Sequence, residues 1–421
     1  PRPIWDNDFH LETVVFTENF RSKAMRKTEI IGLILFVVGM SVFTILPFSS
    51  QYRLSEEQLR SSVKDIHLDQ LAELVQPMYG QTYTSTHSFL TAYSTYFQPY
   101  NNELKAKQAW DQVIWDDYGF VLAKAAMDGP SKTNPWASLG LSIGLIVLGG
   151  IMYNLGGNGS SHDSLTHTGV FHSSLKNKGL LGLLTGSYLI LFYVVLYWFP
   201  AYLSPLVWMV EPISQFLSGG PASQWFLYGL VYTLAIGVMG VRMLLKYRGN
   251  RYQQLRTASL IFFQTAFAFL IPEVLVLLNK PYFDFKNIWP LDYDFFYDYQ
   301  LDTFISSGGL GLFMLVWGIL LIVIGVPVFT YFYGKRWYCS WVCGCGGLAE
   351  TAGDSFRHLS SKKMSAWKIE RWLIHVVLVF SIVMTVGMVY TYLGYDKNQF
   401  WLTRNLFITL VIGFLTLKFT D

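Results

Sequence analysis

The chain has 421 residues, of which 52% are hydrophobic and 17% aromatic, while only 14% are charged. Ordinary soluble domains carry about 25% charged residues, so this composition excludes a water-soluble globule and predicts an integral membrane protein. The net charge of +3 is too small to indicate a nucleic-acid partner, and none is expected.

Eight segments are long and apolar enough to cross a bilayer, for which a helix needs about 20 residues. They lie near residues 30–48, 137–156, 179–200, 224–246, 258–279, 308–333, 372–394 and 400–419. A helix pairs its backbone groups internally, as the hydrocarbon region demands. The sequence therefore predicts an all-α fold, a polytopic transmembrane helix bundle in contact with membrane lipids.

Basic residues gather in the connections that share one side in an eight-span count. Lys and Arg stand before the first span, between the fourth and fifth, and between the sixth and seventh, whereas the connection after the fifth span is acidic. Because basic residues concentrate on the cytoplasmic side, we expect the amino-terminal segment 1–29 and the cysteine-containing loop 334–371 in the cytoplasm.

The connection between the first two spans, residues 49–136, is long enough to form a small domain. It opens with Ser55-Glu56-Glu57-Gln58, a capping-box pattern, and apolar residues follow at helical spacing. Another helix is expected from about Asn102 to Ala126. The topology places this helical domain outside the cytoplasm, where a structural lid or a docking surface is the expected role.

All three cysteines of the chain fall within one short segment, at Cys339, Cys343 and Cys345. Clustered thiolates are the ligands of iron–sulfur centres, and thiolates also bind zinc or Cu(I). Gly344 and Gly346 are expected to let the backbone turn and to leave amides free to donate to a bound cluster.

Two cations precede the first cysteine. Lys335 and Arg336 are expected to favour thiolate over thiol and to offset the negative charge of a cluster. These residues alone are compatible with several roles of the cysteines: binding an iron–sulfur cluster, binding zinc, delivering copper or exchanging thiols. The cysteines could also simply pack as small apolar residues. Asp354 or His358 could supply a further ligand.

The segment 335–343, followed by Gly347-Leu348-Ala349-Glu350, resembles the C-x3-C-P-x-G segment of membrane polyferredoxins. These multi-span proteins are related to the nitrous-oxide reductase regulator and to the H subunit of periplasmic nitrate reductase. The resemblance implies a [4Fe–4S] centre at the cytoplasmic face of a bacterial inner membrane. It also implies a subunit of a membrane redox complex that relays electrons between a quinol or soluble donor and a partner redox protein, with quinone as a further candidate cofactor.

The segment departs from that pattern in two ways. Gly344 stands where the family has proline, and the sequence has no cysteine after Cys345. Three thiolates leave one corner of a cubane cluster without a ligand, so we expect the native chain to continue past Asp421 with the missing one. The alternative function is a non-catalytic scaffold or assembly factor with a structural metal site.

One carboxylate, Glu273, lies inside a predicted span, directly after Pro272. An ionisable residue in the membrane is costly, and function is its default explanation. Proton handling or quinol binding is one interpretation, and a buried hydrogen bond with Gln264, about two turns earlier, is the other. A transmembrane dihaem relay is not expected, because it needs several histidines and only His375 lies in a predicted span.

Overall fold

The computed structural model describes residues 27–109, 112–114, 118–155, 179–283, 285, 295–296, 298–334, 337–359, 361 and 363–392. The predicted eighth span lies outside the described residues, as do Lys335 and Arg336.

Within the described residues, seven helical segments are long and apolar enough to cross a membrane. They are Lys27–Phe48, Pro135–Tyr153, Leu180–Trp198, Gln224–Lys246, Arg251–Leu277, Gly308–Tyr333 and Met364–Gly387. Each overlaps one of the first seven predicted spans, so the all-α polytopic bundle is confirmed. These helices suggest a membrane protein.

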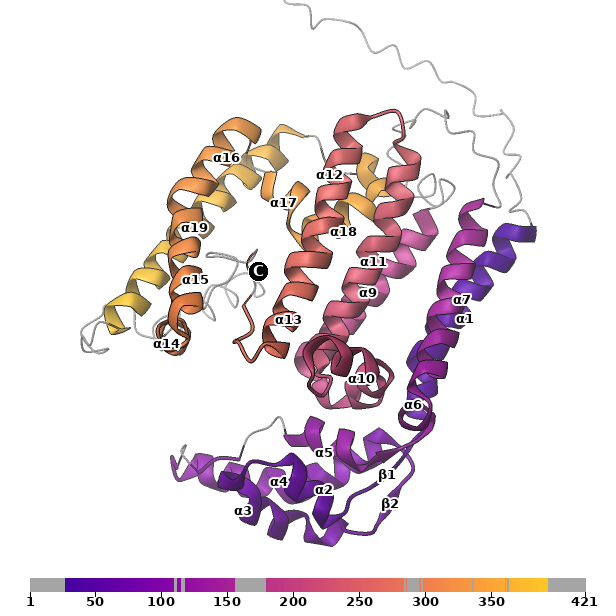
Figure 1. Ribbon diagram of the computed structural model, residues 1–421, viewed down its shortest axis with the longest axis vertical. Helices are drawn as coiled ribbons and strands as arrows, with labels where there is room; N and C mark the ends of the chain where they lie inside the picture. The colour runs from indigo at the N-terminus through magenta and orange to yellow at the C-terminus, as the bar shows by residue number, and fades with distance from the viewer. Residues whose placement is uncertain are drawn as a thin grey trace, which may run out of the picture.

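Helices α1 (Lys27–Ile45) and α7 (Pro135–Leu155) lie along each other at one side of the bundle (Figure 1). A Cβ atom on Gly32 would overlap the backbone nitrogen of Tyr153, and one on Gly149 would overlap that of Phe36. Small residues at such a crossing let two membrane helices pack backbone against backbone. A 3-10 turn, η1 (Leu46–Phe48), ends the first span.

Two further spans form the middle of the bundle. Helix α9 (Leu180–Trp198) connects through η4 (Pro200–Leu203) and α10 (Ser204–Ser218) to α11 (Gln224–Lys246). The chain then turns back into one continuous span made of α12 (Arg251–Phe262), the π-helix η5 (Phe263–Leu270) and α13 (Ile271–Leu277). Pro272 has no backbone N–H, and the wider π turn before it accommodates the interrupted hydrogen-bond ladder.

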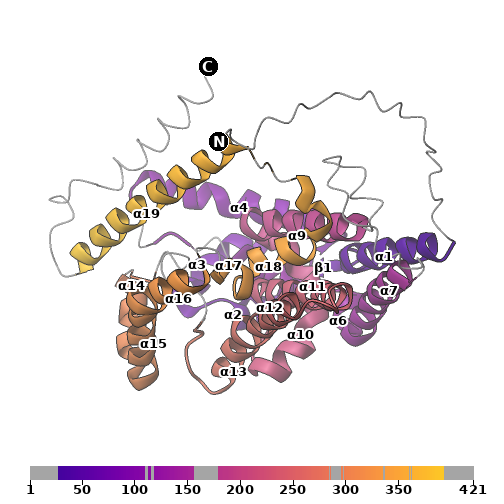
Figure 2. The ribbon, with the colours of Figure 1, turned by 90° about the horizontal axis from the view of Figure 1, so that it is seen from above.

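The carboxyl-terminal elements complete the described chain. They are α14 (Asp298–Ser306), α15 (Gly308–Leu320), the π-helix η6 (Leu321–Gly325), α16 (Val326–Tyr333), α17 (Trp337–Trp341), α18 (Gly344–Thr351), η7 (Asp354–Leu359) and α19 (Met364–Tyr392). Seen from above, α15 and α16 lie at the opposite side of the bundle from α1 and α7, with α9, α11 and α12 between them (Figure 2).

The domain between the first two spans combines short helices with a small sheet. The helices are α2 (Glu56–Ser62), α3 (Asp65–Val75), η2 (Gln76–Met78), α4 (Thr86–Ala106), α5 (Tyr118–Ala126) and α6 (Pro130–Thr133). Strand β1 (Gln51–Arg53) pairs antiparallel with both β2 (Thr82–Tyr83) and β3 (Met127–Asp128). The sequence did not predict this sheet, because strands of two or three residues show no alternation of apolar and polar positions.

The capping box at the start of α2 is confirmed: the Gln58 amide donates to Ser55 Oγ at 3.2 Å, and the Ser55 amide donates to Gln58 Oε1 at 3.0 Å. The helix predicted from Asn102 to Ala126 is wrong, because α4 has ended at Ala106 and α5 starts only at Tyr118. The Asn101 side chain bonds both backbone groups of Ile114 and so holds the intervening loop in place.

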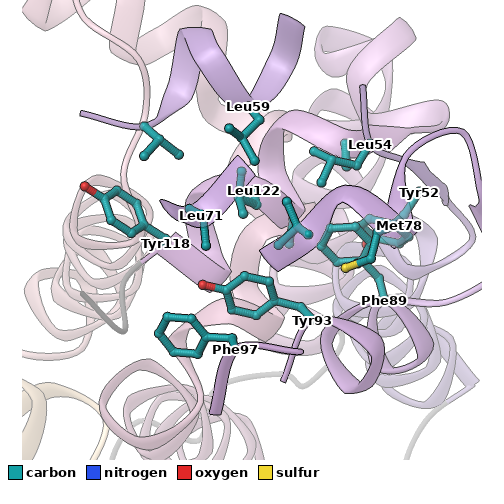
Figure 3. Close-up of a cluster of buried hydrophobic side chains, with 14 of the residues drawn as sticks. Tyr52, Leu54, Leu59, Leu71, Met78, Phe89, Tyr93, Phe97, Tyr118 and Leu122 are labelled. Carbon is teal, nitrogen blue, oxygen red and sulfur yellow. The ribbon is translucent and has the colours of Figure 1, made fainter. Parts of the chain in front are cut away.

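Apolar side chains from α2, α3, α4 and α5 form the core of this domain. Leu59, Leu71, Phe89 and Leu122 are all fully buried there (Figure 3). The domain therefore has a hydrophobic core of its own, separate from the lipid-exposed spans.

A buried ion pair attaches the domain to the bundle. Lys124 Nζ in α5 lies 2.8 Å from Glu211 Oε2 in α10, and both side chains are nearly buried. The ammonium also donates to the Ala222 carbonyl at 2.6 Å, and the Trp208 indole donates to the Lys124 carbonyl at 2.9 Å. Burial lowers the pKa of Lys124, while Glu211 opposes that shift.

Replacement of Lys124 by alanine should leave the Glu211 carboxylate buried without its counter-charge. We expect Lys124→Ala to lower the free energy of unfolding by about 3 kcal/mol, measured by denaturant unfolding in detergent. The matched control is Lys107→Ala, because the Lys107–Glu103 pair lies on the exposed surface of the same domain. Equal stability of the two variants would contradict the anchoring role.

Candidate functional site

The three cysteines lie on a helical hairpin formed by α17 and α18. Cys339 is in α17, Cys343 is the N-cap residue of α18 with an extended backbone, and Cys345 is in the first turn of α18. None of the three forms a disulfide; Cys339 and Cys345 are exposed and Cys343 is partly buried. The hairpin thus brings three soft donors onto two adjoining helical turns.

The glycines of the hairpin serve close packing. Gly344 and Gly346 lie in α18 and neither has a positive φ, while Cys343 with its extended backbone lies where the chain turns between the two helices. A Cβ on Gly346 would overlap the Cys339 carbonyl oxygen, and one on Gly347 would lie 2.6 Å from Leu260 Cδ1. The first-turn amides of a helix lack intrahelical acceptors, and their donation to a cluster stays a prediction.

Ion pairs attach the far end of the hairpin to α11 and α12. Arg256 Nη2 lies 2.5 Å from Glu350 Oε2, and Lys246 pairs with Asp354. The Tyr247 hydroxyl donates to the second Asp354 oxygen at 2.9 Å. Both oxygens of Asp354 thus accept bonds from α11 and the residue after it, and a role of Asp354 as a further ligand stays a prediction. The side chain of His358 lies outside the described structure.

Hydrogen bonds between uncharged groups attach the break between α17 and α18 to the fifth span. Gln264 is buried in η5 and donates through Nε2 to the Val342 carbonyl at 2.5 Å. Ser259 Oγ donates to the Trp341 carbonyl at 3.2 Å. These two carbonyls belong to the break between α17 and α18, where helical hydrogen bonding is interrupted. The hairpin is thus bound along the whole first half of the fifth span.

The hairpin descends toward the middle of the bundle. Gln264 lies near the centre of the 27-residue span Arg251–Leu277, and a Cβ on Gly344 would lie 2.8 Å from its Oε1 atom. Figure 1 shows α17 and α18 beside α12 and α11, well below the connection between those two helices. The sequence placed the cysteines on a loop at the membrane surface, whereas Cys343 and Cys345 lie beside the middle of two spans.

Two tyrosines of α11 face the thiols, and sequence reasoning missed both. The Tyr232 hydroxyl forms a hydrogen bond with Cys345, and Cys343 also lies within electrostatic reach of it. The ring of Tyr228 lies 5.4 Å from that of Tyr232, centroid to centroid. Their spacing of four residues, which puts them on one helix face, was the available signal.

The predicted hydrogen bond between Gln264 and Glu273 does not form. Gln264 turns to the hairpin instead, where its amide donates to the Val342 carbonyl. Among the described residues, none donates a hydrogen bond to Glu273 or pairs with it. A proton or quinol role for Glu273 stays a prediction.

The three cysteine thiols are donors of the kind that an iron–sulfur cluster uses, and they would fill three of the four ligand positions of a cubane. Within the described residues, no group of three or more His, Cys, Asp and Glu side chains is arranged to hold one metal ion. Since Cys339 is exposed, packing does not lock its side chain away from the other two.

Comparison with known proteins supports an iron–sulfur centre in this segment. A family model described as "4Fe-4S binding domain" matches residues 315–365, a segment that includes the whole hairpin and all three cysteines. No curated protein and no solved structure matches the chain. The match supports an iron–sulfur binding protein.

Replacement of Gly346 by alanine should force α17 and α18 apart, because the new methyl group meets the Cys339 carbonyl. We expect Gly346→Ala to destabilise the protein by about 1–3 kcal/mol, as overpacking does. Gly237→Ala in α11 is the control, since its Cβ has open space around it. A thermal unfolding midpoint for Gly346→Ala equal to that of Gly237→Ala would show that the contact is unimportant.

Proposed function

We propose that this protein is a membrane-embedded electron-transfer subunit that carries a [4Fe–4S] cluster on the α17–α18 hairpin. The observation that carries the proposal is the set of three cysteines, none in a disulfide, inside the segment that matches a 4Fe-4S binding domain. Such a cluster, when bound, supplies one-electron transfer. The relation to membrane polyferredoxins such as the nitrous-oxide reductase regulator belongs to the same proposal.

Cys339, Cys343 and Cys345 would hold the cluster, with a fourth ligand from outside the described residues. The other residues of the site position these three. Gln264 fixes the Val342 carbonyl next to Cys343, and the Arg256–Glu350 pair fixes the far side of α18. Helices α11 and α12 exclude water from one side of the hairpin.

We place the protein in a bacterial inner membrane with the hairpin opening toward the cytoplasm. The basic α11–α12 connection, which contains Lys246, Arg248 and Arg251, supports this orientation. The domain with the small sheet lies at the opposite end of the bundle, so it would face away from the cytoplasm (Figure 1). Other subunits of a membrane redox complex would be the electron-transfer partners.

Metal and sulfide content test the proposal directly. Protein purified without oxygen should contain iron and acid-labile sulfide in the 4:4 ratio of the family and a reducible paramagnetic signal. Cys343→Ser should abolish both, whereas Ser340→Ala, between two of the cysteines, should retain them. Stoichiometric zinc without iron would instead favour the scaffold function with a structural metal.

An apolar cavity favours a quinol as electron donor over a soluble protein. It measures about 140 Å³, lies among α1, α7, α9 and α11, and is almost entirely apolar. An apolar cavity of roughly 150 Å³ takes up a benzene ring, and an isoprenoid tail has the same character. Tyr188 in its wall begins a series of rings, Tyr188–Phe192–Tyr228–Tyr232, with centroids 5.4–6.5 Å apart, which ends at Cys345.

Filling this cavity should slow electron entry from a quinol. Ala235 lines the cavity, and we expect Ala235→Phe to reduce the rate of cluster reduction by a short-chain quinol about tenfold, the effect of about 1.4 kcal/mol of lost binding. Ile190→Phe, on the exposed face of α9, is the control. An unchanged rate of cluster reduction in the Ala235→Phe protein would contradict quinol binding in this cavity and favour a soluble donor.

A further inference from the structure

The Tyr232 hydroxyl bonds directly to one of the three cysteines. Tyr232 lies in α11, on the face that meets the start of α18, and its hydroxyl is hydrogen-bonded to Cys345. A phenol donates strongly and a sulfur atom is the weaker donor of the two. The tyrosine is therefore the donor in this bond once Cys345 is a thiolate.

Gly344 makes this approach possible. A Cβ atom at residue 344 would lie 2.7 Å from Tyr232 Cε1 and 3.1 Å from its hydroxyl oxygen. Any other residue there would push the ring away from the start of α18. The same Cβ would meet Gln264 Oε1, whose amide nitrogen is committed to Val342. Gln264 thus supports the backbone, and Tyr232 reaches the sulfur.

We propose that Tyr232 is a positioning residue that raises the reduction potential of the cluster by donating a hydrogen bond to the Cys345 ligand. This inference rests on the proposed function, since it requires a cluster on the hairpin. Reduction adds one negative charge, and a donor that withdraws electron density from a ligand sulfur stabilises the reduced state.

The depth of the hairpin strengthens the effect. At mid-span little water is available to solvate the added charge, and a hydrogen bond in a medium of low dielectric is stronger than one in water. Lys246 and Arg256 are engaged with Asp354 and Glu350, at or just beyond the far end of the hairpin, and Arg242 of α11 also interacts electrostatically with Asp354. A neutral phenol supplies the stabilising dipole without the cost of a buried charge.

Tyr232→Phe tests this role because it removes only the hydroxyl. In the purified, cluster-loaded protein, we expect a more negative midpoint potential in a redox titration followed by the paramagnetic signal, with iron and sulfide content unchanged. Tyr252→Phe is the matched control, because Tyr252 also packs on the hairpin, with its ring 5.9 Å from that of Trp341. Its potential should equal that of the unaltered protein.

The outcomes separate the inference from the function on which it rests. Equal potentials for Tyr232→Phe and Tyr252→Phe, both with intact clusters, would overturn the role of Tyr232 and leave the electron-transfer proposal standing. Loss of the cluster from Tyr232→Phe alone would make Tyr232 a requirement for assembly and would also overturn the tuning role. Absence of iron and sulfide from the unaltered protein would remove both proposals.

Discussion

The hydrogen bond from Gln264 to the Val342 carbonyl is the interaction on which the position of the site depends. Val342 lies where α17 ends and α18 has not yet begun, so its carbonyl has no helical partner. Inside a membrane an unpaired carbonyl costs several kcal/mol, and irregular backbone persists there only when protein groups satisfy it. The amide of Gln264, presented by a π-helix, meets that requirement and allows the cysteines to lie beside the middle of the fifth span.

The bonds that hold the hairpin change in character along its length. At the end near the α11–α12 connection they are ion pairs, Lys246–Asp354 and Arg256–Glu350, and toward mid-span they involve neutral amide and hydroxyl groups. This order follows the cost of desolvation, which is high for a charge at mid-span and lower near water. It also leaves the surroundings of Cys343 and Cys345 uncharged on the α11 side, which suits a centre whose charge changes by one electron.

Several functional features were readable from residues adjacent in the sequence. The span positions, the capping box at Ser55 and the cluster of three cysteines each depend on a local pattern, and the structure or the family match agrees with them. Tyr232, Gln264 and Arg256 could not be assigned to the site in this way. They lie 78 to 113 residues before their partners, as the pairs Gln264–Val342, Arg256–Glu350 and Tyr232–Cys345 show, and no local pattern links the members of such a pair. The break between Ala106 and Tyr118 was missed for the same reason, since a single distant pairing, Asn101 with Ile114, holds it.

The sequence by itself determined an all-α fold with helices long enough to span a membrane, and it predicted an iron–sulfur centre at Cys339, Cys343 and Cys345, because hydrophobic length and thiolate clustering are properties of neighbouring residues. Only the tertiary structure decided where those thiols lie and what faces them. The thiols lie deep in the bundle because α17 and α18 pack against α11, α12 and η5. The same packing pairs Gln264 with Val342 and brings Tyr232 to Cys345. Gly344 shows the difference. Its sequence context predicted a turn of the backbone, whereas the structure shows that the absence of a side chain at residue 344 lets the ring of Tyr232 pack against the start of α18.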